Sequence, residues 1–199
     1  MSVEVLISLP ETLRPVSAVR STLIQSSLDT LRKRGHFARY LTLVDPRFRE
    51  RIVETIAPEW LDMDLALAHY GACDALALGH EELLEIGEAV GEHIQGTFVA
   101  MIVRRARVLG LTPWVPLSQF QRLWERLMTG GGVSLVRTGP NEARAEVCLL
   151  PLAKFAYFRA GFSGVISSAI KLGAGRNVTI RVLPSVQHEQ RCVFRCSWV

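Results

Sequence analysis

The sequence predicts an α+β fold, with a helical N-terminal part followed by an antiparallel sheet of about four strands packed against helices. Two observations predict it. Apolar residues recur at helical spacing through most of the first two thirds of the chain, whereas alternation of apolar and polar residues is confined to the last third. Within that last third the loop "GPNE" separates two alternating segments, which is the pattern of an antiparallel hairpin.

The chain begins with a short apolar stretch, residues 1–15, that we expect to form a strand or an arm laid on the core. Residues 16–33 carry apolar side chains at roughly helical spacing, and Gly35 follows as a C-terminal stop. The sequence therefore predicts a first helix there. The next segment, "FARYLTLV", is ambiguous.

Two further helices are predicted before residue 80. Asp45 is an N-cap residue and Pro46 suits a first helical position, so a helix begins there and ends at the Pro58 break. Asp62 is a candidate cap for the following helix, which ends at Gly79.

The longest predicted helix runs from about residue 80 to residue 109. Its glutamates lie early and its arginines late, which suits the helix dipole. Gly87 and Gly91 are four residues apart and share one face. Because an interior glycine costs about 1 kcal/mol relative to alanine, we expect another backbone to approach this face closely.

The loop at residues 78–81 is the best candidate for a boundary. It divides the chain into an N-terminal helical segment, 1–79, and an α+β ligand-binding-like domain, 80–199. The sequence has no internal repeat and no low-complexity tract, so we expect the two parts to form one compact unit.

After residue 110 the sequence predicts a helix at 117–128, a hairpin at 133–149 and a second helix at 152–172. A pair of strands is predicted at 177–183 and 191–199. The second helix contains "YFRAGFSGVISSAI", with small residues along one side. In the last strand alternate residues form one apolar face, which we expect to be buried: Cys192, Phe194, Cys196 and Trp198.

Composition excludes several classes of protein. With 49% hydrophobic and 21% charged residues, the chain is expected to be soluble and globular. No apolar run reaches the about 18 residues of a membrane span, so we expect a cytoplasmic protein without a membrane partner. The four cysteines are expected to be reduced and mostly buried. The net charge of +4 is mild, and we interpret the arginine clusters as solvated helix faces rather than a nucleic-acid site.

Metal binding is not expected. His69 and Cys73 are four residues apart, and Cys192 and Cys196 share a strand face near His188, but the close CxxC or HExxH spacing of a specific site is missing.

Catalysis is not expected either. The serines of the 152–172 helix lie on no nucleophile elbow, and no histidine is placed to activate them. His93 is the most central candidate haem ligand, but a lone helical histidine is more often a surface or core residue. We predict no catalytic residue and no enzyme, and the sequence leaves the cofactor unknown.

From about Leu84 onward the chain resembles the vinyl-reductase-type ligand-binding domain, whose superfamily includes haem-NO-binding sensor domains and small subunits of vesicle-tethering complexes. The resemblance rests on the glycine-bearing long helix, the hairpin, "YFRAGFSGVISSAI" and the closing "CVF". The Cys and Gly-Asp elements usual before that cysteine are replaced by "SVQHEQR", so redox or metal roles do not carry over. The whole chain is also similar to a family of uncharacterised myxobacterial proteins of about this length.

The resemblance implies that the 152–172 helix lies across the sheet, lines an apolar chamber, and uses its glycines to approach the sheet backbone. We therefore predict a sensory or regulatory bacterial module that binds a small apolar ligand between Phe98, Met101, Phe158 and Phe162. The alternative is a protein–protein interaction adaptor or homodimerisation module with a filled core, docking another signalling protein. Its surface candidates are Trp60, Trp114 and Val115.

Overall fold

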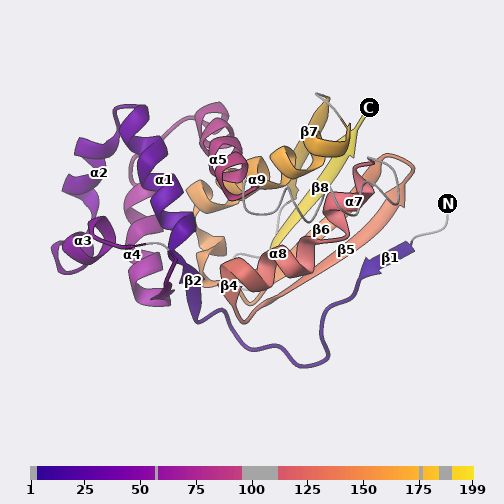
Figure 1. Cartoon of the computed structure of the whole chain (residues 1–199), viewed down its shortest axis with the longest axis horizontal. Helices are drawn as coiled ribbons and strands as arrows, with labels where there is room; N and C mark the ends of the chain where they lie inside the picture. Colours follow the sequence, from indigo (N-terminus) through magenta and orange to yellow (C-terminus); the bar gives the residue numbers. More distant parts are fainter. Residues whose placement is uncertain (1–3, 57, 96–111, 175–176, 184–189) are drawn as a thin grey trace.

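The computed structural model describes residues 4–56, 58–95, 112–174, 177–183 and 190–199 of the 199 (Figure 1). The main sheet has five antiparallel strands in the order β1-β5-β6-β8-β7. The hairpin expected at 133–149 is confirmed, and its two strands lie inside this sheet. The fifth strand is the N-terminal stretch, which pairs with the hairpin as an edge strand. The strands are β1 (Glu4–Ile7), β5 (Gly132–Gly139), β6 (Glu142–Cys148), β7 (Val178–Leu183) and β8 (Cys192–Trp198).

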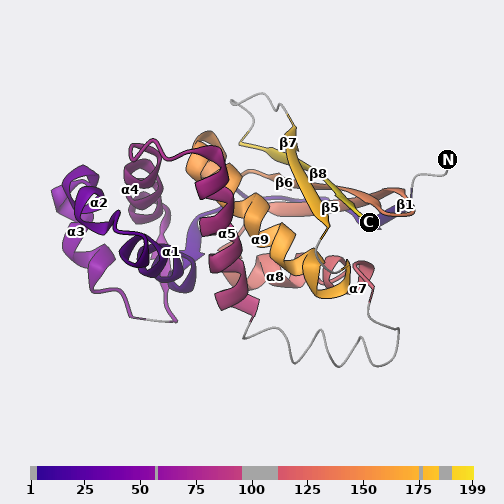
Figure 2. The same ribbon diagram turned by 90° about the horizontal axis from the view of Figure 1, so that it is seen from above.

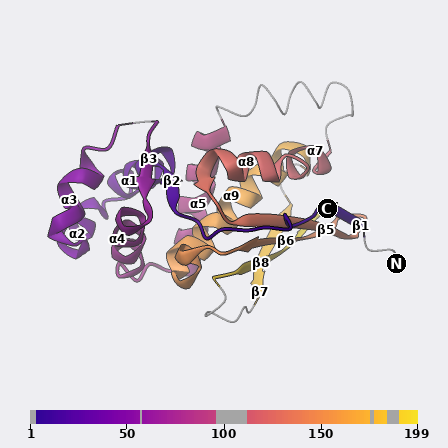
Figure 3. The same ribbon diagram turned by 90° about the horizontal axis from the view of Figure 1, so that it is seen from below.

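A second, three-stranded sheet joins the two parts of the chain. Its central strand β2 (Ala18–Arg20) pairs with β3 (Trp60–Asp62) on one side and β4 (Met128–Thr129) on the other. Figure 3 shows β2 and β3 side by side next to the N-terminal helices. Strand β2 was expected within the first helix and β4 at the end of another, because strands of two or three residues are too short to show alternation.

The N-terminal helices follow the expected caps. Asp45 Oδ1 accepts a hydrogen bond from the Arg47 backbone N–H, as an N-cap should. Asp62 precedes its helix without capping it through its side chain. The ambiguous segment is helical. The helices are α1 (Ser21–Lys33), α2 (Phe37–Leu43), α3 (Pro46–Val53) and α4 (Met63–Asp74).

The remaining helices lie on one side of the main sheet, as Figure 2 shows for α9, α8 and α7. Alternate residues of the strands point toward them and are fully buried, including Ala145, Phe194 and Cys196. The helices are α5 (His80–Gln95), α7 (Trp114–Leu117), α8 (Phe120–Leu127), the 3-10 turn η1 (Pro151–Lys154) and α9 (Ala156–Ala174). The expected continuation of α5 to residue 109 lies outside the described residues.

The closest backbone approach is between α5 and α9. A Cβ on Gly87 would lie 1.9 Å from the carbonyl oxygen of Gly161, and one on Gly164 would lie 2.4 Å from that of Leu84. The glycines of α9 were expected to let this helix approach the sheet backbone. That expectation is wrong, because Gly164 and the carbonyl group of Gly161 meet α5, whereas Phe162 contacts Phe194 of the sheet.

The start of α9 is fixed by α4. Asp74 Oδ1 accepts a hydrogen bond of 2.7 Å from the backbone N–H of Tyr157, one of the N–H groups that an α-helix leaves without an internal partner. All four cysteines are buried and free, as expected. Within the described part of the chain, no helix has the length and apolarity that crossing a membrane requires.

Candidate functional site

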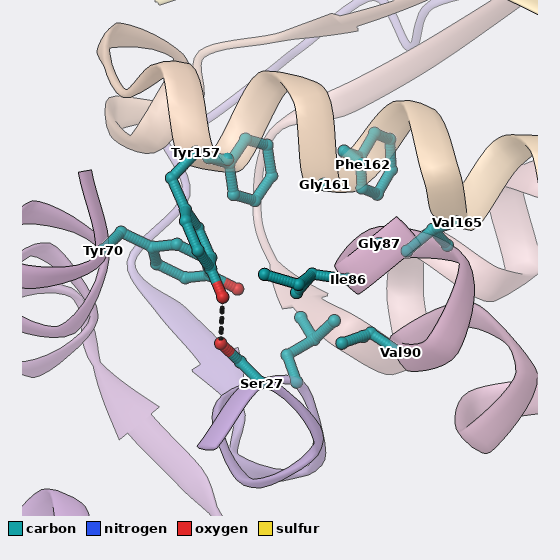
Figure 4. A pocket seen from close by; sticks show the side chains of 11 residues that line it. Ser27, Tyr70, Ile86, Gly87, Val90, Tyr157, Gly161, Phe162 and Val165 are labelled. Atoms are coloured by element: carbon teal, nitrogen blue, oxygen red, sulfur yellow. Dashed lines mark hydrogen bonds between the residues drawn. The ribbon is translucent and has the colours of Figure 1, made fainter. Parts of the chain in front are cut away.

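A small apolar cavity, of about 30 Å³, lies where α1, α4, α5 and α9 meet (Figure 4). On one side are Ile86, Gly87 and Val90 of α5, and on the other are residues of α9. A Cβ added to Gly161 would meet nothing within 4 Å, because this glycine borders the open space. The cavity therefore lies between helices. From the sequence it had been expected between helices and sheet.

Aromatic side chains fill most of the space around α9. The rings of Phe158 and Phe162 stack with centroids 5.5 Å apart, and Phe162 also meets Trp124 of α8 and Phe194 of β8. A second apolar cavity, of about 20 Å³, lies between α7, α8, α9 and β6, and Val165 borders both cavities. Among the described residues, these two small apolar spaces thus lie beside α9.

One end of the first cavity is polar. The hydroxyl groups of Ser27 on α1 and Tyr157 on α9 form a hydrogen bond of 2.8 Å, and both residues line the cavity. Figure 4 shows these two hydroxyls pointing at each other across the gap between the helices. This hydrogen bond links the N-terminal helices directly to α9.

The polar end continues into a buried network around His69. Its Nε2 lies 3.2 Å from Ser27 Oγ, and its Nδ1 lies 2.9 Å from the hydroxyl of Tyr40 on α2. Cys73 Sγ is 3.6 Å from Nε2. The chain of hydrogen bonds from Tyr157 through Ser27 and His69 to Tyr40 therefore crosses four helices.

Burial keeps this network uncharged. Loss of solvation lowers the pKa of His69 to about 3. The same cause raises the pKa of Tyr40, Tyr157 and Cys73 well above their usual ranges. At neutral pH every member is therefore neutral, and His69 donates from one ring nitrogen and accepts at the other.

The expected site residues have different outcomes. Phe158 and Phe162 line the first cavity, whereas Phe98 and Met101 lie outside the described residues. The sequence analysis did not single out Ser27 and Tyr157. Ser27 gave a signal, because it lies four residues from both Leu23 and Leu31 and so interrupts the apolar face of α1.

The chain was compared with known proteins. No protein-family model and no curated protein matches it, so the similarity to a myxobacterial family is unsupported. Solved structures do match. An Fe(II) unliganded H-NOX protein from K. algicida has a TM-score of 0.66 at 9% identity, covering 90% of this chain and 96% of that one. The chain has the H-NOX fold.

Other H-NOX structures agree. A Cs H-NOX variant has a TM-score of 0.61 at 13% identity, over 90% of this chain and 96% of its own. An oxygen-binding H-NOX domain related to soluble guanylate cyclases has a TM-score of 0.54 at 13% identity, over 89% and 94%. At these low identities the TM-scores show a shared fold.

Haem does not fit the cavity of this H-NOX fold. The space of about 30 Å³ is far below the about 300 Å³ at which ligand pockets begin, and the contact of Gly87 with Gly161 closes the gap between α5 and α9. No histidine lines this cavity among the described residues. His69 has both ring nitrogens engaged, so neither is free to ligate iron.

His93, the most central haem candidate in the sequence, lies elsewhere. It borders an open hollow of about 520 Å³ with Arg20, Trp60, Glu125 and Arg126. Trp60 and the further lining residues Pro58, Ile94 and Leu127 are apolar, so this hollow is of mixed polarity. Within the described residues, no group of three or more His, Cys, Asp or Glu side chains is placed to hold a metal ion.

Proposed function

We propose that this chain is a non-enzymatic sensory or regulatory module that binds a small apolar ligand in the cavity between α1, α5 and α9. One observation carries the proposal. Gly161 stands in the interior of α9, where glycine costs about 1 kcal/mol relative to alanine, yet an alanine methyl group there would meet no other atom. Glycine at this position therefore leaves the cavity unfilled, whereas a side chain would occupy it.

The ligand would be small. A cavity needs about 10–15 Å³ to hold one water molecule, so about 30 Å³ admits a molecule of a few heavy atoms. The walls are apolar except at the Ser27–Tyr157 hydrogen bond, so an apolar molecule is favoured over water. That a protein of the same fold is an oxygen-binding domain supports a ligand of this size.

Binding would change the packing of helices that belong to both parts of the chain. The cavity touches α1 and α4 of the N-terminal part and α5 and α9 of the rest. A ligand that favours a slightly wider spacing of these helices shifts the population toward that spacing. The Ser27–Tyr157 hydrogen bond lies in the path of that change.

Xenon tests the proposal, because it is apolar, small and inert. We expect dissolved xenon to shift the methyl NMR signals of Leu23, Ile86 and Val165 in a saturable way. The variant Gly161→Ala fills the cavity and should reduce these shifts about fivefold or more, as a cavity that loses its free volume loses its ligand. Gly79→Ala is the matched control, because a Cβ there also meets nothing within 4 Å but lies away from the cavity.

Two results would contradict the proposal. One is a wild-type protein whose methyl signals do not respond to xenon. The other is a response that Gly161→Ala leaves unchanged. Either result would favour the alternative, an adaptor with a filled core.

A further inference from the structure

The face of the main sheet that no described helix covers carries a row of arginines. The strand register places Arg144 of β6 directly opposite Arg195 of β8, and Arg195 directly opposite Arg181 of β7. All three side chains are exposed. Because neighbouring strands lie about 4.8 Å apart, the row presents three cations at nearly even spacing.

The fold itself gains nothing from this row. Like charges directly opposite each other destabilise a sheet. Glu142 lies 3.2 Å from Arg195 and offsets its charge. Glu146 lies 3.5 Å from Arg144, but it is also 3.1 Å from Arg191, so it is shared.

Arg181 completes the row at the edge of the sheet. In the part of the chain that the structure describes, no carboxylate forms a salt bridge with it, and β7 is the outer strand there. The uncompensated charge of the row is therefore concentrated on its most accessible member.

The same row continues as apolar side chains. Val136 of β5 lies opposite Arg144, and Val5 of β1, which is 58% exposed, lies opposite Val136. A row that is apolar at one end and cationic at the other resembles a protein interface, where arginine is enriched and the core is apolar. A nucleic-acid surface would instead extend the cations to follow phosphates.

We infer that this row, Val5, Val136, Arg144, Arg195 and Arg181, is a docking surface for an acidic helix of a partner protein. Helix geometry fits the spacing of the row. With a rise of about 1.5 Å per residue, glutamates at positions i, i+3 and i+7 lie on one face at about 0, 4.5 and 10.5 Å along the axis. Three arginines on adjacent strands lie at about 0, 4.8 and 9.6 Å.

Arg181 can then bind one carboxylate through two parallel N–H donors. Arg195 and Arg144 bind theirs beside Glu142 and Glu146, with which they share their donors. An apolar residue one further turn along the partner helix would meet Val136 and Val5. This surface is on the opposite side of the sheet from the ligand cavity, so the inference stands independently of the proposed function.

The test uses a helical peptide with glutamates at i, i+3 and i+7 and leucine at i+11, labelled for fluorescence anisotropy. The control peptide has glutamine in place of each glutamate. We expect the glutamate peptide to bind the full chain, with an affinity that falls as salt rises, and the glutamine peptide to bind about tenfold more weakly or not at all. In NMR spectra the perturbed signals should belong to β6, β7 and β8.

The protein variant is Arg181→Glu, and the matched control is Arg39→Glu, which reverses an exposed arginine on α2. Arg181→Glu should weaken the binding of the glutamate peptide about tenfold. It should leave the melting temperature equal or higher, because it puts a carboxylate opposite Arg195. Arg39→Glu should change the affinity little. Loss of binding without loss of stability separates a docking role from a structural one.

Three outcomes would overturn the inference. The first is no difference between the glutamate and glutamine peptides. The second is equal loss of affinity in Arg181→Glu and Arg39→Glu, which would indicate general charge attraction. The third is a single-stranded oligouridylate that binds the row more tightly than the peptide does, which would assign the surface to nucleic acid.

Discussion

His69 is completely buried, and both of its ring nitrogens are within hydrogen-bonding distance of hydroxyl groups from other helices. A protonated imidazole would have two donors and no acceptor, and it would lack a countercharge, because the groups around it are neutral. Folding therefore depends on the neutral form of this side chain.

This dependence predicts a loss of stability in acid. Burial holds the pKa of His69 at about 3, against 6.5 for an exposed histidine. Between these values the unfolded chain binds a proton here and the folded chain does not. The stability that His69 contributes is therefore complete above pH 6.5 and falls by about 1.4 kcal/mol per pH unit as the pH drops toward 3.

Urea unfolding of the wild type and of His69→Gln, at several pH values from 7 to 4, measures this effect. The other histidines and the carboxylates are the same in both proteins, so the difference between the two curves isolates His69. Parallel curves would show that His69 keeps its ordinary pKa in the folded protein.

Two of the residues that line the cavity, Phe158 and Phe162, were named from the sequence, and the polar ones were not. Phe158 and Phe162 were predicted because the resemblance places their helix along an apolar chamber. His69 was considered only as a metal ligand with Cys73, since its true partners, Ser27 and Tyr40, are distant in sequence. Hydrogen bonds between helices leave no spacing pattern along one helix.

At the scale of elements, the contact of α5 with α9 determines where the cavity lies. Gly87 and Gly91 of α5 both face α9, as the sequence predicted for a close backbone approach. Glu88 secures the contact, because it accepts hydrogen bonds from Ser167 Oγ and Lys171 Nζ on α9. The identity of the partner helix was not predictable, since a glycine pair shows that a neighbour is close but not which one.

Two alanine substitutions in this contact should have opposite effects. A Cβ on Gly87 would lie 1.9 Å from the Gly161 carbonyl oxygen, so Gly87→Ala must push the helices apart, at a cost of about 1–3 kcal/mol. Gly161→Ala meets no atom and removes a helix-interior glycine, so it should stabilise by up to about 1 kcal/mol.

Chemical denaturation of both variants beside the wild type measures the two changes in unfolding free energy. Gly161→Ala should have the higher unfolding free energy of the two variants. If Gly161→Ala were as destabilising as Gly87→Ala, the space beside Gly161 would not exist in solution.

At the scale of the molecule, the buried side chains form one continuous cluster that crosses the boundary between residues 1–79 and 80–199. Strand β2 adds backbone pairing across it, to β3 of the first part and β4 of the second. The order of helices and strands was visible in their periodicity. The small sheet was not, because its strands come from three distant segments and each is too short to show a pattern.

We therefore predict a single cooperative unfolding transition for the whole chain. In a Trp60→Phe variant the remaining tryptophans, all in the second part, give a fluorescence signal for that part, and far-UV circular dichroism reports mainly on the helices of both. The two signals should give the same denaturant midpoint. Separate midpoints would mean that the parts fold as independent domains.

The pairing of β1 with β5 affects the order in which the chain acquires its structure. Glu4 lies opposite Arg137, so the first strand meets a partner that is far along the sequence. A ribosome releases the N-terminus first, and β1 then waits without a neighbour until the β5–β6 hairpin has emerged. Closing so long a loop also has an entropic cost. Only pairing with an already formed hairpin can offset that cost. Strand β1 is thus synthesised before the strand it pairs with and joins its own sheet late.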